Sequence, residues 1–152
     1  MILSGRDVKW YIEQGKLVVR PIEENQFQQN GIDLILDQID SSDSFSSESI
    51  TMSDLTFHLG KSREYFEMPD DLMAFVALRS TWARKGLIIP LTIVDAGFKG
   101  TLTMELFNCK YMVAPIGERV FHLVFAKLTG PSVPYSGKYQ GQIAITGPIE
   151  DK

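Results

Sequence analysis

The fold is decided by the stretch from Gly86 to Gly130, which reads GLIIPLTIVDAGFKGTLTMELFNCKYMVAPIGERVFHLVFAKLTG. It consists of short β-favouring segments that are separated by turn residues. The expected strands are Leu87–Val94, which Pro90 breaks, Thr101–Asn108 and Val120–Leu128, and the expected breaks are Gly97–Gly100, Pro115–Gly117 and Gly130-Pro131. Turns at this spacing favour an all-β barrel or jelly roll over alternating βαβ units.

The beginning of the chain carries a helix signal. Ser4 is a suitable N-cap, and Asp7 places an acidic side chain in the first turn. Apolar or aromatic side chains then recur with helical spacing, at Val8, Tyr11 and Ile12. Gly15 is a natural stop. The sequence therefore predicts one short N-terminal helix ahead of the β-rich remainder.

The middle and the end of the chain alternate between apolar runs and turn signals. The expected elements are a strand at Leu17–Val19, a turn at Asn30-Gly31, a strand at Ile32–Leu36, a turn at Met68–Asp71 and an apolar run at Leu72–Leu78. Residues 38–54 are rich in serine and acidic residues and predict a mobile loop or a weak hairpin. Residues 134–152 are polar and glycine-rich and have little to bury, so we expect them to order against something else.

Length and charge limit the classes of protein to consider. The chain has 152 residues, which suits one domain over residues 1–152 with a single core. Its formal net charge is -4, whereas nucleic-acid-binding domains usually show a basic face, so nucleic acid is not an expected partner. An acidic chain that binds phosphates must gather its arginines locally or recruit a divalent cation. Neither an apolar run long enough to span a membrane nor a signal peptide is visible.

The cysteine and histidine content excludes zinc chemistry of the usual kinds. Cys109 is the only cysteine, so no internal disulfide can form and a reducing, cytoplasmic location is expected. His58 and His122 are the only histidines. A structural zinc site, or the His-plus-paired-Cys site of zinc nucleobase deaminases, cannot be assembled within one such chain. Any deamination by this protein must therefore proceed without zinc.

Arg79, Ser80 and Arg84 form the first candidate cluster. Guanidinium groups make bidentate, charge-assisted bonds to phosphate oxygens, and a serine hydroxyl can donate to a bridging oxygen. Taken alone, these residues are better explained as a solvated strand end with a helix cap at Ser80, because Arg and Ser are common at strand ends.

Two carboxylates near the glycine-bounded turn are candidates for acid–base work. Asp95 lies between an apolar strand and the turn, where it can hold a water or a sugar hydroxyl while Gly97 allows close approach. The alternative is an Asx-turn, in which the carboxylate satisfies backbone N–H groups. Strand alternation places Glu105 on one face with Thr103 and Phe107, so this carboxylate either faces solvent or is buried for a purpose.

Two further candidates lie outside this central region. Asp33 follows the Asn30-Gly31 turn and could hold magnesium-bound waters, although a turn carboxylate would look the same. The segment from Tyr135 to Gln142 mixes a cation, phenols and amides on a flexible backbone. Such a tail can fold over a nucleotide, with Lys138 as a point charge for the terminal phosphates. A solvated C-terminal tail is the alternative.

Five motifs, in this order, resemble those of the dUTPase/dCTP deaminase superfamily. They are Asn30–Leu34, Arg79–Arg84, Val94–Gly100, Gly117–Val120 and Lys138–Gln142. The resemblance extends over nearly the whole chain, and its second and third motifs are quite specific. It implies a homotrimer of distorted jelly-roll barrels with three active sites at subunit interfaces, each using a magnesium–nucleotide complex.

The resemblance also implies roles for individual residues. In a dUTPase, Asp95 would position and deprotonate the attacking water, and Asp33 would reach the metal through its water shell. In a zinc-free deaminase, Glu105 would shuttle protons at the cytosine ring, with Ser80 and Arg84 holding the water and orienting that glutamate. The implied nucleotide-binding residues are Arg79, Ser80, Thr81, Arg84, Asp95, Phe98, Thr103, Tyr135, Lys138 and Gln142, and residues 135–152 form a tail that closes over the nucleotide.

The chain departs from each of the two enzyme patterns. Phe98 stands where most dUTPases have a tyrosine under the deoxyribose, and His122 stands where a glutamine usually follows the fourth motif. The tail has the Lys-Tyr-Gln-Gly-Gln form of the deaminases. The segment from Gly86 to Asp95, in contrast, is shorter than in the deaminases and has the spacing of dUTPases.

The sequence therefore leads to a first choice and two alternatives. The first is a dUTP diphosphatase that hydrolyses dUTP to dUMP and pyrophosphate with Mg²⁺. The second is a zinc-independent dCTP deaminase, or an enzyme with both activities. The third is a nucleotide-binding regulator that has lost turnover. Substrate preference between uracil and cytosine, and whether the tail covers its own or a neighbouring site, stay open at this point.

Overall fold

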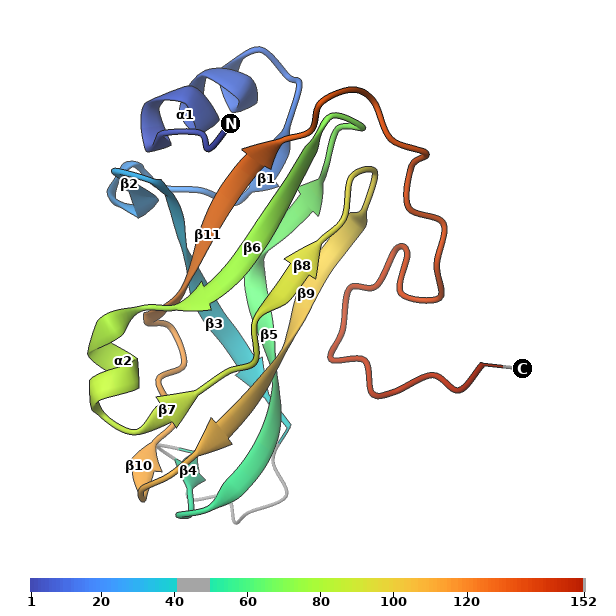
Figure 1. Cartoon of the computed structure of the whole chain (residues 1–152). Coiled ribbons are helices and arrows are strands. Elements are labelled where there is room, and N and C mark those ends of the chain that lie inside the picture. Colours follow the sequence, from blue (N-terminus) through green and yellow to red (C-terminus); the bar gives the residue numbers. More distant parts are fainter. Residues whose placement is uncertain (41–49, 152) are drawn as a thin grey trace.

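The computed structural model describes residues 1–40 and 50–151, in which strands dominate (Figure 1). The helices are α1 (Gly5–Glu13), α2 (Ser80–Arg84) and the short 3-10 helix η1 (Glu24–Gln26). The strands are β1 (Val18–Arg20), β2 (Phe27–Gln28), β3 (Gly31–Ile39), β4 (Thr51–Met52), β5 (Thr56–Glu67), β6 (Leu72–Leu78), β7 (Leu87–Ile88), β8 (Thr92–Val94), β9 (Lys99–Asn108), β10 (Met112–Val113) and β11 (Arg119–Lys127). An all-β fold with a short N-terminal helix is thereby confirmed. Residues 41–49, inside the predicted loop or hairpin, lie outside the described residues.

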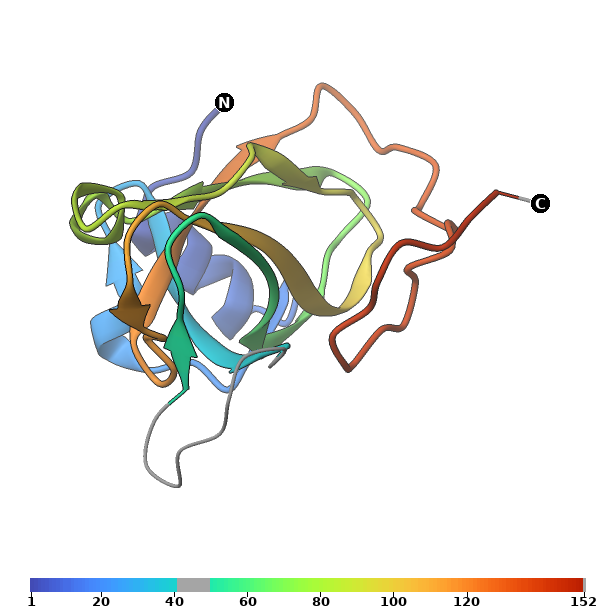
Figure 2. The ribbon, with the colours of Figure 1, turned by 90° about the horizontal axis from the view of Figure 1, so that it is seen from below.

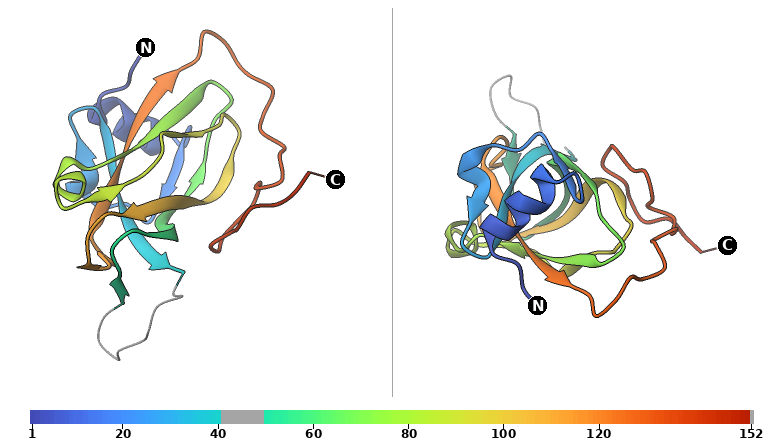
Figure 3. Two further views of the ribbon diagram at one scale, coloured as in Figure 1. Left: turned by 60° about the horizontal axis from the view of Figure 1, so that its bottom comes forward. Right: turned by 90° about the horizontal axis from the view of Figure 1, so that it is seen from above.

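Helix α1 begins and ends where the sequence predicts. The Ser4 hydroxyl accepts a hydrogen bond from the Asp7 backbone N–H at 3.2 Å, and the Asp7 carboxylate accepts one from the Ser4 backbone N–H at 3.2 Å. This reciprocal pair satisfies backbone donors that the first turn leaves free. Gly15 follows the helix with a φ of 66°, a conformation that glycine adopts without strain. Figure 3 shows α1 lying across one end of the curled sheet, where Val8 is fully buried.

Nine of the described strands form one antiparallel sheet. Its main path runs β7-β9-β5-β3-β11-β6-β8, while β1 pairs with β5 and β2 pairs with β3. Strands β7 and β8 lie at opposite ends of this path, yet only residues 89–91 separate them in the chain. So short a link forces the two edges together, and the sheet therefore curls on itself (Figure 2).

The curl encloses an apolar core. Phe66, Phe121 and Phe125 are the largest fully buried side chains, and they come from β5 and β11. Strand β6 shows the expected alternation, with Leu72, Ala74 and Val76 turned inward. No helix in residues 1–40 or 50–151 is long and apolar enough to cross a membrane.

Several elements begin or end at other residues than the sequence indicates. Strand β9 starts at Lys99, so the predicted break at Gly97–Gly100 is shorter than expected. Strand β3 continues to Ile39. The cap predicted at Ser80 is displaced by one residue, because Arg79 is the N-cap of α2 and Ser80 is its first helical residue. The Trp82 indole donates to the Arg119 carbonyl at 2.9 Å, which fixes α2 against β11.

Candidate active site

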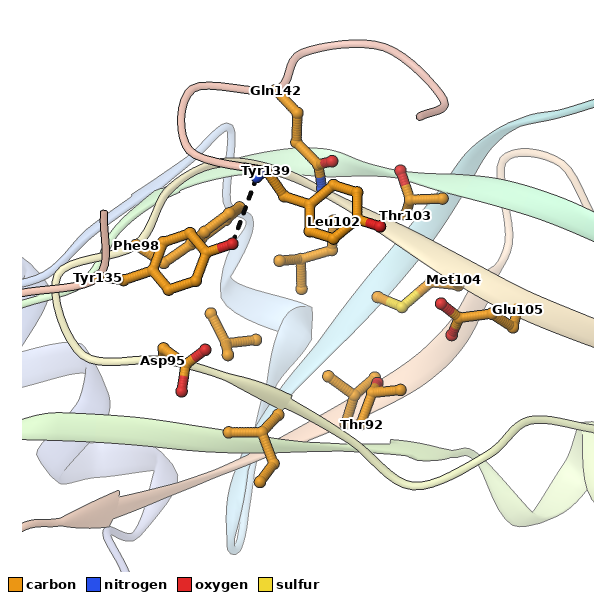
Figure 4. Close-up of a pocket in the computed structure, with 13 residues that line it drawn as sticks. Thr92, Asp95, Phe98, Leu102, Thr103, Met104, Glu105, Tyr135, Tyr139 and Gln142 are labelled. Atoms are coloured by element: carbon orange, nitrogen blue, oxygen red, sulfur yellow. Dashed lines mark hydrogen bonds between the residues drawn. The ribbon is translucent and has the colours of Figure 1, made fainter. Parts of the chain in front are cut away.

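A cavity of about 220 Å³ opens in the seam between β8 and β9 (Figure 4). These strands follow one another in the chain but do not pair with each other. The cavity therefore lies where the curled sheet fails to close. Its lining residues are Val76, Thr92, Ile93, Val94, Asp95, Phe98, Leu102, Thr103, Met104, Glu105, Tyr135, Tyr139 and Gln142.

Asp95 stands at one end of this cavity, directly after β8. The turn that follows is closed by the main chain, since the Phe98 N–H donates to the Asp95 carbonyl at 3.2 Å and Gly97 takes a φ of 78°. Among the described residues, the Asp95 carboxylate takes part in no hydrogen bond or ion pair. The turn thus forms without the side-chain bonds of an Asx-turn, and the carboxylate stays available to a ligand.

Glu105 stands at the opposite end of the cavity in the view of Figure 4. It lies on β9 with Thr103 on the same, partly exposed face, as alternation predicts. A second cavity of about 350 Å³ continues beyond it, and the two cavities share Thr103, Glu105, Tyr139 and Gln142. The Glu105 carboxylate also has no ion-pair partner in the described part of the chain. The pocket therefore offers two carboxylates that no cation of residues 1–40 or 50–151 neutralises.

Aromatic rings form one wall near Asp95. Phe98 is 6% exposed, and its ring centroid lies 5.9 Å from that of Tyr135 with the planes tilted by 59°. The Tyr135 hydroxyl accepts a hydrogen bond from the Tyr139 backbone N–H at 3.3 Å. An apolar, flat wall of this kind suits a sugar or a base.

The C-terminal tail covers the cavity, in agreement with the expectation that it orders against something else (Figure 4). The Gly141 N–H donates to the Lys99 carbonyl and the Thr101 N–H donates to the Gln142 carbonyl, both at 2.8 Å. The tail thus runs beside the start of β9 like a short added strand. It brings Tyr135, Tyr139 and Gln142 to the cavity.

Gln142 presents an unused acceptor to the two cavities. Its amide nitrogen donates to the Thr101 carbonyl at 2.9 Å. Its amide oxygen is buried and has no hydrogen-bond partner in the described residues. A buried polar atom without a partner is uncommon and points to a ligand or a water at this position. Lys138, in contrast, lines neither cavity, and its ammonium lies 3.0 Å from the Asp151 carboxylate.

Arg79, Ser80 and Asp33 gather elsewhere, in a shallow cavity of about 270 Å³ that is also lined by Gln28, Gln29, Ala77, Leu78 and His122. Val76 faces the first cavity and Ala77 this one, so the two openings lie on opposite sides of β6. Thr81 and Arg84 are exposed on α2 and line neither cavity. One chain therefore unites Asp95, Phe98, Thr103, Glu105, Tyr135 and Gln142, and keeps the arginine cluster apart from them.

Asp33 is the buried centre of this second cluster. Its Oδ2 lies 3.0 Å from Arg79 Nε, in an ion pair that is not aligned as a hydrogen bond, and 3.7 Å from an Arg119 nitrogen. Its Oδ1 lies 2.9 Å from His122 Nδ1. Two arginines around one carboxylate leave an excess of positive charge around Asp33. This surrounding favours an anion such as phosphate.

A directly bound metal ion fits these residues poorly. Asp33 is already surrounded by three basic side chains. In residues 1–40 and 50–151, no group of three or more His, Cys, Asp or Glu side chains could hold a metal ion. The role of Asp33 toward magnesium-bound water stays a prediction.

Glu64 is a buried carboxylate that no local sequence motif marked as a candidate. It accepts hydrogen bonds from the Gln26 amide at 2.6 Å and from the Ile35 N–H at 3.2 Å. Burial raises the pKa of Glu64 to about 7, although these hydrogen bonds act in the opposite direction. The Gln26 amide also donates to the Asp33 carbonyl at 2.9 Å, so Glu64 supports the strand that carries Asp33.

Comparisons with known proteins identify the family to which the chain is similar. Residues 37–128 match the family model described as dCTP deaminase-like. The chain is 43% identical over 158 residues to the "Probable deoxyuridine 5'-triphosphate nucleotidohydrolase" of Sulfolobus islandicus rod-shaped virus 1, covering 99% of this chain and 100% of that protein. It is 37% identical over 176 residues to the dCTP deaminase of Hyperthermus butylicus, covering 99% and 100%.

Among solved structures, the dCTP deaminase of Agrobacterium tumefaciens has a similar fold. Its TM-score is 0.69 at 17% sequence identity, and the match covers 84% of this chain and 47% of that one. At this identity the likeness concerns the fold alone. The family model and the two sequence relatives go further, and they lead to one conclusion: the chain belongs to the dUTPase/dCTP deaminase superfamily.

Proposed function

We propose that this protein is a dUTP diphosphatase, which hydrolyses dUTP to dUMP and pyrophosphate. The observation that carries the proposal is the Asp95 carboxylate, which lines a roofed cavity and has no partner among the described residues. A carboxylate held in this way can orient a water and accept its proton as the water attacks the α-phosphorus. The Phe98 and Tyr135 rings would hold the nucleoside beside it.

The phosphates would be bound by a second copy of the chain. Arg79, Ser80 and Arg84 carry the donors that suit a polyphosphate, but they lie away from the Asp95 cavity of their own chain. A homotrimer in which this cluster faces the cavity of a neighbour would unite the two halves. The arginines would then neutralise charge that develops at the α-phosphorus, and the substrate would be the magnesium complex of the triphosphate.

The alignments with relatives favour dUTP hydrolysis over deamination. The match to the probable viral dUTPase named above extends over 158 residues, whereas matches to dCTP deaminases extend over 168 to 176 residues. All of these spans exceed the 152 residues of the chain, so each alignment contains gaps, and those with the deaminases contain more of them.

Glu105 favours the second candidate, a zinc-free dCTP deaminase. Its carboxylate lines both cavities and has no cationic partner in the described residues. Such a group could carry protons to and from a cytosine ring that lies between Asp95 and Glu105. An enzyme with both activities would use the two carboxylates in succession.

A product analysis tests the proposal. The purified protein is incubated with dUTP and, separately, with dCTP in the presence of magnesium, and nucleotides, pyrophosphate and ammonia are resolved. We expect dUMP and pyrophosphate from dUTP, and no ammonia from dCTP. Asp95→Asn should lower kcat by about a hundredfold or more, because the amide cannot accept the proton of water. If the protein releases ammonia from dCTP and leaves dUTP unchanged, the proposal is wrong and the second candidate, a dCTP deaminase, takes its place.

A further inference from the structure

The side chain of Gln140 joins the C-terminal tail to the turn that carries Asp95. Its amide oxygen accepts a hydrogen bond from the Lys99 N–H at 2.7 Å. Its amide nitrogen donates to the Gly97 carbonyl at 2.9 Å and to the Tyr135 carbonyl at 2.8 Å. The Gln140 side chain thus connects both ends of the turn with Tyr135, the first of the tail residues that line the cavity. Gln140 itself lines neither the first nor the second cavity.

The turn is shaped to receive this tail. A Cβ atom on Gly97 would lie 2.5 Å from Pro134 Cβ, and one on Gly100 would lie 2.6 Å from the Gln142 carbonyl oxygen. Both glycines also take positive φ values, 78° and 146°. Larger side chains at these positions would push the tail away, so the close contact depends on the two glycines.

Main-chain bonds extend the same contact on either side of Gln140. The Tyr135 N–H donates to the Ala96 carbonyl at 2.8 Å, and the Gly141 N–H donates to the Lys99 carbonyl at 2.8 Å. These bonds hold the tail against the turn that carries Asp95, beside the cavity that Tyr135, Tyr139 and Gln142 line.

We propose that Gln140 is a positioning residue that holds the tail over the cavity of its own chain, so that Tyr135, Tyr139 and Gln142 are in place before the nucleotide binds. The expected effect of Gln140 on catalysis rests on the proposed function, whereas the docking of the tail does not. Without the hydrogen bonds of the Gln140 side chain, the tail would leave the cavity for part of the time. Apparent affinity falls in proportion to the fraction of molecules that are competent to bind, whereas a saturating nucleotide restores the docked state.

Hydrogen exchange measured by mass spectrometry tests the docking without any substrate. The variants are Gln140→Ala and Gln140→Glu, which keeps the acceptor for Lys99 but loses both amide donors. Gln14→Ala, at the exposed C-cap glutamine that follows α1, is the matched control. We expect faster exchange in residues 134–146 and at Thr101 for both Gln140 variants, with an unchanged Tm. Gln14→Ala should match the wild type. Equal protection of the tail in Gln140→Ala and wild type overturns the proposal, whatever the enzyme catalyses.

Kinetics separate positioning from a merely structural role. If Gln140→Ala reduces the docked fraction to about a tenth, KM for dUTP rises about tenfold while kcat stays within about twofold. A fall in kcat with unchanged KM would contradict the proposal. If the wild type does not hydrolyse dUTP at all, the proposed function fails, and the exchange experiment still decides the role of Gln140.

Mixed oligomers test whether the tail serves its own chain. Asp95→Asn and Gln140→Ala proteins are refolded together and assayed at a dUTP concentration well below the KM of Gln140→Ala. If tail and turn belong to one chain, every site carries one of the two defects and the activity equals that of the separate variants. If the tail crosses to a neighbour, about a quarter of the sites combine an intact Asp95 with an intact Gln140. Recovery of about a quarter of the wild-type activity would therefore contradict the proposal.

Discussion

Single residues decide which of the two reactions the seam cavity supports. Asp95 and Glu105 line the same cavity, and in the described residues neither carboxylate is tied to a cation. They differ in what surrounds them. Asp95 adjoins the Phe98 and Tyr135 rings, whereas Glu105 lies at the border with the second cavity. In the proposed hydrolysis the attack on phosphorus would use Asp95, and in the alternative deamination the proton transfer at the base would use Glu105.

Replacing Glu105 by glutamine should separate the two activities. The amide has nearly the same shape as the carboxylate but cannot shuttle a proton at neutral pH. Hydrolysis of dUTP should survive in Glu105→Gln within a few-fold, whereas any release of ammonia from dCTP should fall by about a hundredfold or more. Pyrophosphate and ammonia assays on the same preparation measure both. A loss of dUTP cleavage in Glu105→Gln, with Asp95 intact, would contradict the assignment of hydrolysis to Asp95.

At the scale of elements, the sequence predicted those parts whose signals are local. Helix α1 was recognisable because Ser4, Asp7 and Gly15 each act on the adjacent backbone. Strand β5, the longest of the described strands, gave no such signal. Its inward positions include His58, Ser62 and Glu64, so polar residues stand where a periodic pattern needs apolar ones.

These inward polar residues are tolerated because partners from distant parts of the chain satisfy them. The Leu102 N–H donates to the Ser62 hydroxyl at 2.9 Å, and Gln26 and Ile35 donate to Glu64. The site shows the same limit. The motif around Asp95 was enough to predict residues that line the cavity. The separation of this cavity from Arg79, however, depends on the curl of the sheet, which brings the two edge strands together. Neither the partners nor the curl can be derived from local spacing.

Glu64 joins β5, β3 and η1 and should make the stability of the fold depend on pH. Burial raises the pKa of Glu64 to about 7 from an ordinary value of 4.5. The folded state then binds more protons than the unfolded state between these two values, so the free energy of unfolding falls as pH rises through this window and is constant above it. The Glu64 side chain therefore stabilises the folded state most when it is protonated.

The Glu64→Gln variant should lack this dependence. The difference in free energy of unfolding, Glu64→Gln minus wild type, should increase by about 3 kcal/mol between pH 4.5 and pH 8. The reason is that only the wild type loses the stabilisation that comes with a protonated Glu64 side chain. Urea unfolding at several pH values and equal protein concentration measures this difference. Parallel curves for the two proteins across the window would show that Glu64 is ionised in the folded state at acidic pH.

At the scale of the whole molecule, one outer face of the sheet fits the self-association that the proposed function requires. Phe57, Phe107 and Ile88 are cross-strand partners on β5, β9 and β7, and they are 58%, 37% and 52% exposed. A row of large apolar side chains in water usually marks an interface. The row lies on the same strand face as Glu105, so an interface there would adjoin the second cavity. A trimer built on this face is consistent with a site shared between subunits.

Complementation between inactive variants tests this shared site. Asp95→Asn removes the carboxylate of the seam cavity, and Arg84→Ala removes a guanidinium from exposed α2. If each site takes Asp95 from one chain and Arg84 from its neighbour, random mixed trimers of the two variants contain about a quarter intact sites. Refolded mixtures should therefore recover about a quarter of the wild-type kcat. Arg84→Ala mixed with Ser80→Ala is the matched control and should recover little, because both defects lie on the same helix. If the first mixture recovers nothing although size-exclusion chromatography shows mixed trimers, the arginine cluster does not serve a neighbouring cavity.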